Sequence, residues 1–567
     1  MRKVLILVLL ISMFSCKEEK TMVSPIEIEV ESTSVIMDST SSIIDSIKID
    51  MTVFKEEEVK DFREFKILDS KYIDISELWS SLDSKLKSFT ETNYNNLKPL
   101  IIEQDILKLQ EHIAQGKLSY ELLTKFYLYR IRKFDRENDL SLNSVIALNP
   151  NIIEEAIAAD SIGFEEDHHP IFGMPILLKD NINASGMPTT AGAVALQNNV
   201  AADAFIVTQL KVQGALIIGK ANLSEWAYFF CGDCPSGYSA IGGQTLNPYG
   251  RRVFDTGGSS SGSGVSIASN FAAAAVGSET SGSILSPSSA NSVVGLKPSV
   301  GLVSRSGIVP ISSTLDTAGP MTKNVMDNAI VLDAMFGQDL SDSKSIYAMW
   351  ENGFYFEKLK QSQSLIGKRF GAYKRLMTDS LYTSALEDLK TLGAEIVEVE
   401  EAPRQLPNFT NLLNLEMKKD LPVYLETYAN SEIEVKSVSD VIAFNKLDST
   451  ETMPYGQKLF DGIVADQGDE IYLNKLKDSL RTIGKTFFDV PSKSFRLDGF
   501  LSINNYHAGL AAVAEYPAIT VPMGYDYNGK PKGLTFIGRR LTEKQLLEYA
   551  YAYEQATMKR LTPKKYD

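Results

Sequence analysis

Two loops rich in glycine and serine are the part of this sequence best suited to chemistry. The first runs Asp255-Thr-Gly-Gly-Ser-Ser-Ser-Gly-Ser-Gly-Val-Ser266, and the second runs Gly277-Ser-Glu-Thr-Ser-Gly-Ser-Ile-Leu-Ser-Pro287, with a segment of small residues between them. Glycine and serine let the backbone approach a ligand closely and point N–H groups at an anion. The two loops therefore predict a site that stabilises negative charge.

Three interpretations fit loops of this composition. A phosphate-binding loop ends in Lys-Ser or Lys-Thr, and a dinucleotide fingerprint carries a spaced acidic residue; neither pattern is present. A flexible linker could explain one such loop, but not two loops on either side of an apolar segment. Nucleophilic catalysis by a serine is the interpretation that remains, and it requires a base.

The histidines offer little support for a Ser-His-Asp triad. His112 falls in a helical segment, and His168 and His169 stand in an acidic turn before Pro170. Only His507, late in the chain, is kept as a candidate pocket residue.

Lys179 is the alternative base. It ends the apolar run Gly173-Met-Pro-Ile-Leu-Leu-Lys179, and burial disfavours the charged form of an amine, which lowers its pKa from about 10.4. A neutral amine can accept a proton from a hydroxyl group. Taken alone, Lys179 would more simply be a lysine that ends a strand at the surface.

The elements that position these residues predict an α/β fold. Between residues 105 and 132 apolar residues recur at helical spacing in two blocks, with Gly116 as a helix stop and Ser119 as the next N-cap. Further along, short apolar runs alternate with helical stretches, which is typical of a buried sheet covered by helices. The runs are 176–178, 215–218, 272–276 and 396–399, and the helical stretches include 202–213 and 385–392. Because no repeat or Pro-rich linker occurs between about 100 and 567, we expect one large domain.

Several motifs occur in a fixed order along the chain: Lys179 within Gly-x-Pro-x-x-x-Lys-Asp, the loop Gly257-Gly-Ser-Ser-Ser-Gly262, Ser283, and Gly295-Leu-Lys-Pro298. Ser259 follows Lys179 by 80 residues, and Ser283 follows Ser259 by 24. Together they resemble the amidase signature family of Ser-Ser-Lys hydrolases over roughly residues 100–567. The runs Asn222-Leu-Ser-Glu-Trp-Ala227 and Gly301-Leu-Val-Ser-Arg305 look most like bacterial peptide amidases, which deamidate peptide C-termini.

The resemblance implies a fold, a reaction and a set of roles. The fold would be an α/β amidase-signature fold, a large mixed twisted β-sheet covered by helices on both sides in a single large domain, residues 101–567. Ser283 would be the nucleophile, Lys179 the base, and Ser259 the bridging serine held by a cis peptide bond. The backbone N–H groups of Thr280, Ser281, Gly282 and Ser283 would form the oxyanion hole. Carboxamides would be hydrolysed to a carboxylate and ammonia through an acyl-enzyme on Ser283.

Two positions depart from the family pattern. Ser281 stands where many members have Gly, and Leu285 stands where many have Arg. The first adds a side chain beside the expected oxyanion hole, and the second removes a cation. Loss of that cation argues against a small acidic substrate.

The amino terminus resembles a bacterial lipoprotein signal. Arg2 and Lys3 precede an apolar run that ends at Ser15-Cys16, and the run is too short to cross a bilayer core, which needs about 20 apolar residues. We expect residues 1–16 to be a signal peptide with Cys16 as the lipidated residue. Residues 17–100 would be a Ser- and acidic-rich tether and N-terminal extension. The protein would pass through the inner membrane and be lipid-anchored in the envelope, at the outer membrane on its periplasmic or surface face. A cleaved signal followed by an incidental free cysteine is the alternative.

Charge and composition limit the partners. The chain has 57 Lys and Arg against 72 Asp and Glu, a net charge of −15, which disfavours nucleic acid. Four His and three Cys leave little material for a metal site, so we expect no metal and no cofactor. Cys231-Gly-Asp-Cys234 is compatible with a disulfide or with two free thiols.

The leading functional hypothesis is an amidase acting on a small-molecule or peptide amide, without an obligate protein partner. The glutaminase-type subunit of a tRNA-dependent amidotransferase shares the same signature, although the signal sequence argues against that cytosolic role. A non-catalytic, ligand-binding envelope lipoprotein is the third hypothesis. Retention of Lys179, Ser259 and Ser283 together argues against it.

Overall fold

The computed structural model describes residues 65–136, 138–346 and 353–567, all of which lie within one compact unit, Glu58–Asp567. The predicted signal peptide with Cys16 and residues 17–64 of the predicted tether lie outside the described residues. Within the described ranges, no helix has both the length and the apolar character needed to cross a membrane.

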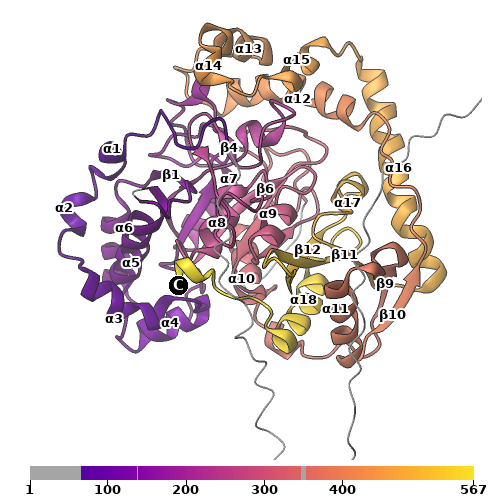
Figure 1. Cartoon of the computed structure of the whole chain (residues 1–567), viewed down its shortest axis with the longest axis horizontal. Coiled ribbons are helices and arrows are strands. Elements are labelled where there is room, and N and C mark those ends of the chain that lie inside the picture. The colour runs from indigo at the N-terminus through magenta and orange to yellow at the C-terminus, as the bar shows by residue number, and fades with distance from the viewer. Residues whose placement is uncertain (1–64, 137, 347–352) are drawn as a thin grey trace, which may run out of the picture. The chain divides into compact units, whose positions relative to one another are not determined.

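A mixed β-sheet forms the centre of this unit (Figure 1). In the described residues it has 11 strands in the order β1-β3-β2-β6-β8-β7-β12-β13-β11-β9-β10. The strands are β1 Val145–Leu148, β2 Pro175–Lys179, β3 Leu216–Ala221, β6 Ala274–Glu279, β7 Val294–Lys297, β8 Thr317–Thr322, β9 Arg369–Tyr373, β10 Glu395–Val399, β11 Gly499–Ile503, β12 Ala518–Tyr525 and β13 Pro531–Ile537. A separate two-stranded ribbon pairs β4 Tyr238–Ser239 with β5 Gly243–Gln244.

The direction of the central strands brings the residues of interest to one edge of the sheet. β2 and β6 are parallel neighbours, so their carboxyl ends, Lys179 and Glu279, lie at the same edge. β8 runs antiparallel to β6 and begins at Thr317, which pairs with Glu279. The loops that follow β2 and β6 and the loop that precedes β8 therefore meet there.

Helices flank the sheet on both faces. α8 packs against α9, and α10 packs against α18, and all four contact central strands. The helices are α1 Ile75–Trp79, α2 Asp83–Leu86, α3 Glu91–Ile101, α4 Ile106–Ala114, α5 Tyr120–Ile131, α6 Ile152–Ile162, α7 Phe205–Val212, α8 Ser261–Ala268, α9 Leu285–Ala290, α10 Val325–Met335, α11 Ser380–Thr391, α12 Phe409–Thr427, α13 Val438–Leu447, α14 Ser449–Thr452, α15 Lys458–Ala465, α16 Glu470–Phe495, α17 Ala508–Ala514 and α18 Glu543–Thr557. Short 3₁₀ or π turns cover Arg132–Arg136, Val194–Leu196, Glu225–Tyr228, Leu359–Gln361, Lys374–Thr378 and Lys564–Tyr566.

The predicted elements are confirmed where local signals are strong. Asp105 caps α4 by accepting the Lys108 N–H, and Ser119 caps α5 by accepting the Leu122 N–H. Between them Gly116 has a φ of +67°, a conformation that glycine adopts at little cost. The expected runs correspond to β2, β3, β6 and β10, and the expected helical stretches correspond to α7 and α11.

Residues from the predicted N-terminal extension also contribute to the main core. Trp79, Leu82, Phe89 and Tyr94 belong to the same buried cluster as the apolar residues of the central strands. α1, α2 and α3 therefore bury their apolar faces against the rest of the unit.

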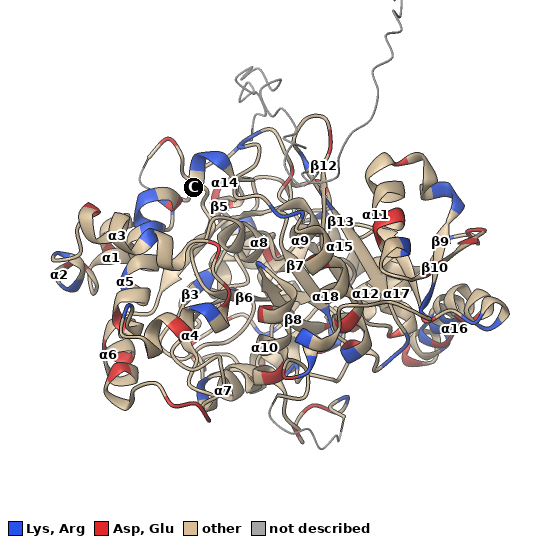
Figure 2. Cartoon of the chain, turned by 90° about the horizontal axis from the view of Figure 1, so that it is seen from below, with Lys and Arg blue, Asp and Glu red and all other residues tan. Residues whose placement is uncertain are grey.

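A second, smaller core lies under helices α12 to α16, which Figure 1 draws in orange along the top and right of the view. Trp226, Phe230 and Phe460 are packed there, with Phe460 in ring contact with both of the others. Figure 2 shows Lys, Arg, Asp and Glu interspersed over helices and loops, while the central strands are mostly tan. Lys179, the last residue of β2, is a lysine within the sheet that has no exposed surface.

Candidate active site

Lys179 ends β2 with its amino group inside the protein. Nζ lies 2.7 Å from Ser259 Oγ, 2.9 Å from Ser278 Oγ and 3.1 Å from the Ser278 carbonyl oxygen. All of these partners are neutral. One strand away, Lys220 has the carboxylate of Asp180 at 3.0 Å instead.

Burial lowers the pKa of Lys179 to about 7, although the negative charges of Asp316 and Glu279 act in the opposite direction. A neutral amine has two N–H groups and one lone pair. The Ser278 carbonyl can only accept a hydrogen bond, and Ser278 Oγ is held by Asn181 Nδ2 at 2.9 Å, so both suit the N–H groups. The lone pair is then left for the hydroxyl of Ser259.

Ser259 is fully buried, and the peptide bond that precedes it, Gly258–Ser259, is cis. Its carbonyl accepts the N–H of Ser224 at 3.0 Å. The next residue, Ser260, donates its N–H to the carbonyl of Ser283 at 3.1 Å. The structure therefore brings the three expected catalytic residues together. Ser259 contacts Lys179 through its side chain, and Ser260, the next residue, contacts Ser283 through its backbone.

The carboxylate of Glu279 shapes the loop that carries Ser283. It accepts the N–H groups of Gly282 at 2.6 Å, Ile284 at 2.7 Å and Leu285 at 3.0 Å, so it caps the start of α9 from the end of β6. The Gly282 N–H, one of four expected to form the oxyanion hole, is thereby committed to Glu279. In the described part of the chain, the N–H groups of Thr280, Ser281 and Ser283 have no acceptor.

Asp316 holds the first residue of this loop. Its carboxylate accepts the Thr280 hydroxyl at 2.5 Å and the N–H groups of Ile311 and Ser312 at 2.8 and 2.9 Å. Burial raises the pKa of Asp316 to about 6. Asp316 thus orients this loop. Asp180 and Arg305 form ion pairs with Lys220 and Asp342.

A cavity of about 230 Å³ opens beside this group. It reaches Ser278 and Thr280, and its walls include Ala227 and Tyr424. Residues between 305 and 313 form a further wall.

A second depression, of about 440 Å³, lies beside the loop that carries Ser281. We call it the Arg404 groove; its lining residues are Arg404, Gln405, Leu406, Tyr506, Gly509 and Leu510. A Cβ atom placed on Gly509 would lie 3.4 Å from Ser281 Oγ. His507, the expected pocket residue, does not line the groove: it is 1% exposed, with Ser502 Oγ on Nδ1 at 2.6 Å and Glu401 on Nε2 at 3.1 Å.

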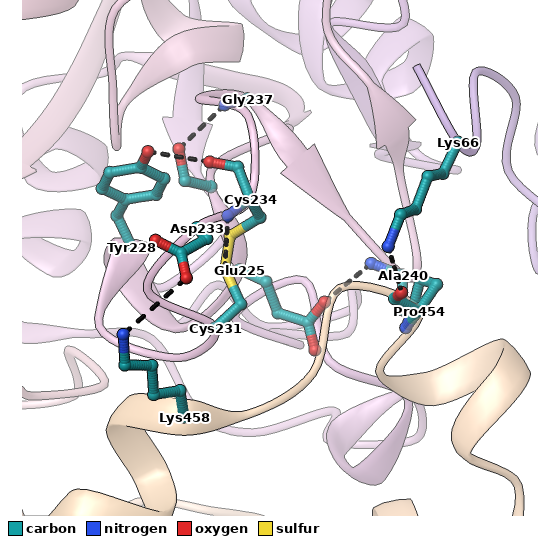
Figure 3. The surroundings of a disulfide bond; sticks show 11 residues. Lys66, Glu225, Tyr228, Cys231, Asp233, Cys234, Gly237, Ala240, Pro454 and Lys458 are labelled. Carbon is teal, nitrogen blue, oxygen red and sulfur yellow. Dashed lines mark hydrogen bonds and ion pairs between the residues drawn. A yellow bond between two sulfur atoms is a disulfide. The ribbon is translucent and has the colours of Figure 1, made fainter.

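Cys231 and Cys234 form a disulfide with a Cα–Cα distance of 5.9 Å, which resolves the alternative that the sequence left open (Figure 3). Tyr228 donates its hydroxyl to the Cys234 carbonyl at 2.8 Å. Gly237, further along the same loop, donates its N–H to Ser224 Oγ at 2.9 Å. Since the Ser224 N–H also donates to the Ser259 carbonyl, the loop closed by the disulfide supports the backbone at Ser259.

Sequence reasoning missed the roles of Asn181, Ser278 and Glu279. Asn181 directly follows the Lys179-Asp180 motif, and Ser278 and Glu279 belong to the second loop rich in glycine and serine, but neither pattern says which way a side chain points. Among the described residues, no cluster of three or more His, Cys, Asp or Glu side chains could hold a metal ion.

Comparisons with known proteins agree with this geometry. The amidase family model matches residues 123–461. A probable amidase of Arabidopsis thaliana is 36% identical over 491 residues, which cover 82% of this chain and 92% of the relative. A glutamyl-tRNA(Gln) amidotransferase subunit of Microcystis aeruginosa is 33% identical over 488 residues, covering 79% and 96%.

Two crystal structures are similar over most of the chain. An amidase family protein from Bacillus anthracis has a TM-score of 0.83 at 37% identity, covering 88% of this chain and 99% of that one. The native peptide amidase from Stenotrophomonas maltophilia has a TM-score of 0.76 at 40% identity, covering 82% and 98%. This chain belongs to the amidase signature family and is a hydrolase of amide C–N bonds.

Proposed function

We propose that the protein hydrolyses carboxamides through an acyl-enzyme on Ser283, and that its substrates are C-terminal peptide amides or similar organic amides. The observation that carries the proposal is the 2.7 Å contact between Lys179 Nζ and Ser259 Oγ, made by an amine whose pKa burial lowers to about 7. The likeness to a bacterial peptide amidase supports the choice of substrate.

In the proposed first step, the lone pair of Lys179 takes the proton of the Ser259 hydroxyl while Ser259 Oγ takes the proton of Ser283. Ser283 Oγ attacks the carboxamide carbon, and the carbonyl oxygen becomes an anion. The N–H groups of Thr280, Ser281 and Ser283 are available to stabilise it, and each such donor is typically worth about 3 kcal/mol in the transition state.

Collapse of this intermediate breaks the C–N bond. The Lys179 ammonium returns its proton through Ser259 to the leaving nitrogen, which departs as ammonia and leaves an ester on Ser283. Water then attacks the ester by the same relay and releases the carboxylate. The sum is one amide and one water converted to one carboxylate and one ammonia.

The test is ammonia release by the full-length protein from a panel of C-terminally amidated peptides and simple amides. Ser283→Ala is expected to abolish it, because no acyl-enzyme can form. Ser286→Ala, a serine three residues further along in α9, is the matched control and is expected to retain activity. Ammonia release that persists in Ser283→Ala, or none from any amide by well-folded wild-type protein, would contradict the proposal.

A glutaminase role is the second candidate, because a glutamyl-tRNA(Gln) amidotransferase subunit is 33% identical over most of the chain. Including free glutamine in the panel separates the two. Preference for glutamine over every peptide amide would favour the amidotransferase role.

We also propose that the protein is exported and carries a lipid on Cys16, on the strength of the sequence Arg2 to Cys16. Metabolic labelling with a fatty acid is expected to mark the wild-type protein and not Cys16→Ala, and the labelled protein is expected in the membrane fraction. An unlabelled protein in the cytosolic fraction would contradict this.

A further inference from the structure

The Arg404 groove lies directly beside the loop that carries Ser283. A Cβ atom on Gly509 would lie 3.2 Å from Leu406 Cδ1 and 3.4 Å from Ser281 Oγ. Asn505, in the turn before α17, comes within 3.0 Å of the position that a Cβ would occupy on Gly282. The groove and the loop that carries Ser283 are therefore in direct contact through Gly509 and Ser281.

Arg404 is anchored by one end of its guanidinium group only. Its Nε lies 2.8 Å from Glu401 Oε1, and 43% of the side chain is exposed. In the described part of the chain, its two terminal nitrogens have no acceptor. They form a fork of the kind that binds a carboxylate with two parallel hydrogen bonds.

The groups around Glu401 leave a net positive charge at the groove. Arg375 contacts both oxygens of Glu401, at 2.5 and 3.3 Å. Burial would raise the pKa of Glu401, but hydrogen bonds from His507 and Arg375 lower it to about 2, so the carboxylate is ionised. Burial lowers the pKa of His507, which keeps the imidazole neutral at pH 7. Two guanidinium groups thus share one carboxylate.

We propose that Arg404 is a specificity-determining residue that binds a carboxylate of the substrate, so that peptide amides with an acidic residue close to the scissile amide are preferred. The inference rests on the proposed function. Leu406 and Leu510 provide an apolar wall for the methylene groups of such a residue. Arg404 follows β10 and is separate from position 285 in α9, where the absence of a cation argues against a small acidic substrate.

Steady-state kinetics of the full-length protein with tripeptide amides test the proposal. The parent peptide is Ala-Ala-Phe-NH₂, and each alanine is replaced in turn by Glu, by Met as a neutral residue of similar length, or by Lys. In the wild type, Glu at one position is expected to lower KM about tenfold relative to Met, as a bidentate charge-assisted pair would. The kcat is expected to stay within about twofold.

Three variants localise the effect. Arg404→Gln is expected to equalise KM for the Glu and Met peptides with kcat unchanged, and Arg404→Glu to favour Lys. Arg375→Gln removes the other guanidinium group that contacts Glu401 and leaves the terminal nitrogens of Arg404 in place. It is therefore expected to retain the preference for the Glu peptide. Loss of that preference in Arg375→Gln, or an equal loss of kcat on all peptides in Arg404→Gln, would contradict the assignment to Arg404.

The outcomes also separate the inference from the function beneath it. Ammonia from all peptides with equal KM for Glu and Met contradicts the role of Arg404 and leaves the amidase proposal standing. Ammonia from none of them contradicts both.

Discussion

Burial makes Lys179 able to accept a proton. Lys179 and Lys220 are both inaccessible to solvent, but Lys220 has the carboxylate of Asp180 beside it and Lys179 has only hydroxyl and carbonyl oxygens. An ion pair favours the charged form of an amine, whereas neutral partners do not offset the cost of desolvation. Of these two buried lysines, Lys179 is the one suited to be a base.

The pH dependence of ammonia release reports on this group. Lys179 must be neutral, so kcat/KM is expected to fall below about pH 7 and to lose about tenfold per unit once the amine is mostly protonated. Asp316 raises the pKa of Lys179 by its charge. Asp316→Asn is therefore expected to move the acid limb to lower pH.

Asp420→Asn is the control for that experiment. Asp420 lines the same cavity and is not among the charges that act on Lys179, so the acid limb is expected to stay near pH 7. An acid limb that does not move in Asp316→Asn, or that moves equally in both variants, would rule out this origin of the pH dependence.

At the scale of elements, the site depends on how β6 passes into α9. Ile284, the N-cap of α9, makes no capping bond with its own side chain. Glu279, the last residue of β6, supplies the acceptor for three N–H groups instead. The Glu279 carboxylate thus accepts N–H groups at the start of α9 and fixes the loop 280–283, which joins β6 to α9.

Replacement of Glu279 tests this double role. Glu279→Ala leaves three N–H groups without their acceptor, so the free energy of unfolding is expected to fall by about 2 kcal/mol, as measured by urea denaturation. The kcat of ammonia release is expected to fall at least about 100-fold, because the N–H groups proposed to stabilise the oxyanion lose their position. Glu165→Ala, at an exposed loop position, should change neither. If Glu279→Ala kept the wild-type stability and the wild-type kcat, the loop 280–283 would not depend on Glu279 for its conformation.

Elements with strong local signals were predictable from the sequence, and those fixed by distant contacts were not. Caps and periodicity indicated α4 and α5, and apolar runs indicated β2 and β6. The sequence prediction gave no helices to the N-terminal extension in which α1 to α3 lie, yet Trp79, Leu82, Leu86 and Phe89 recur at helical spacing and are buried, a signal that periodicity could have shown.

The same division applies to the site. Lys179, Ser259 and Ser283 could be proposed because motifs of a family mark them. Arg404 lies in a charged loop after β10 with no motif of its own, and the packing of Gly509 in α17 against both Leu406 and Ser281 brings that segment to the loop 280–283. Its position depends on the order of strands in the sheet, which local sequence does not encode.

At the scale of the whole molecule, buried polar contacts join segments that are far apart in the chain. Asp327, in α10 near the middle of the sequence, accepts the N–H of Ile106 at the start of α4, 221 residues away, at 2.8 Å. Burial, followed by the charge of Asp105, raises the pKa of Asp327 to about 7. The contact therefore couples the protonation of one carboxyl group to the packing of the N-terminal helices.

This coupling predicts a pH dependence of stability. Between the unfolded pKa of 3.8 and the folded pKa of about 7, the folded state keeps a proton that the unfolded state has lost. The contribution of Asp327 to stability is therefore expected to decrease as pH rises through that window. Asp327→Asn removes the titration, so its free energy of unfolding relative to wild type should increase from pH 4.5 to pH 8 in urea denaturation.

Asp478→Asn, on the exposed side of α16, is the control, and its stability relative to wild type should not vary over that range. If the difference in the free energy of unfolding between Asp327→Asn and wild type were also constant with pH, Asp327 would have the same pKa in the folded and unfolded states.

The last residues of the chain lie against the helices that come first in the described sequence (Figure 1). Tyr566 is fully buried; its carbonyl accepts a hydrogen bond from Arg130, its ring contacts Phe134, and its hydroxyl donates to the Leu140 carbonyl at 2.8 Å. Arg130 and Tyr566 are 436 residues apart in the sequence. The helix α5 can therefore complete its packing only after Tyr566 has been synthesised, so this part of the core forms late while the chain is being made. A group fused directly after Asp567 would begin one residue from this buried contact.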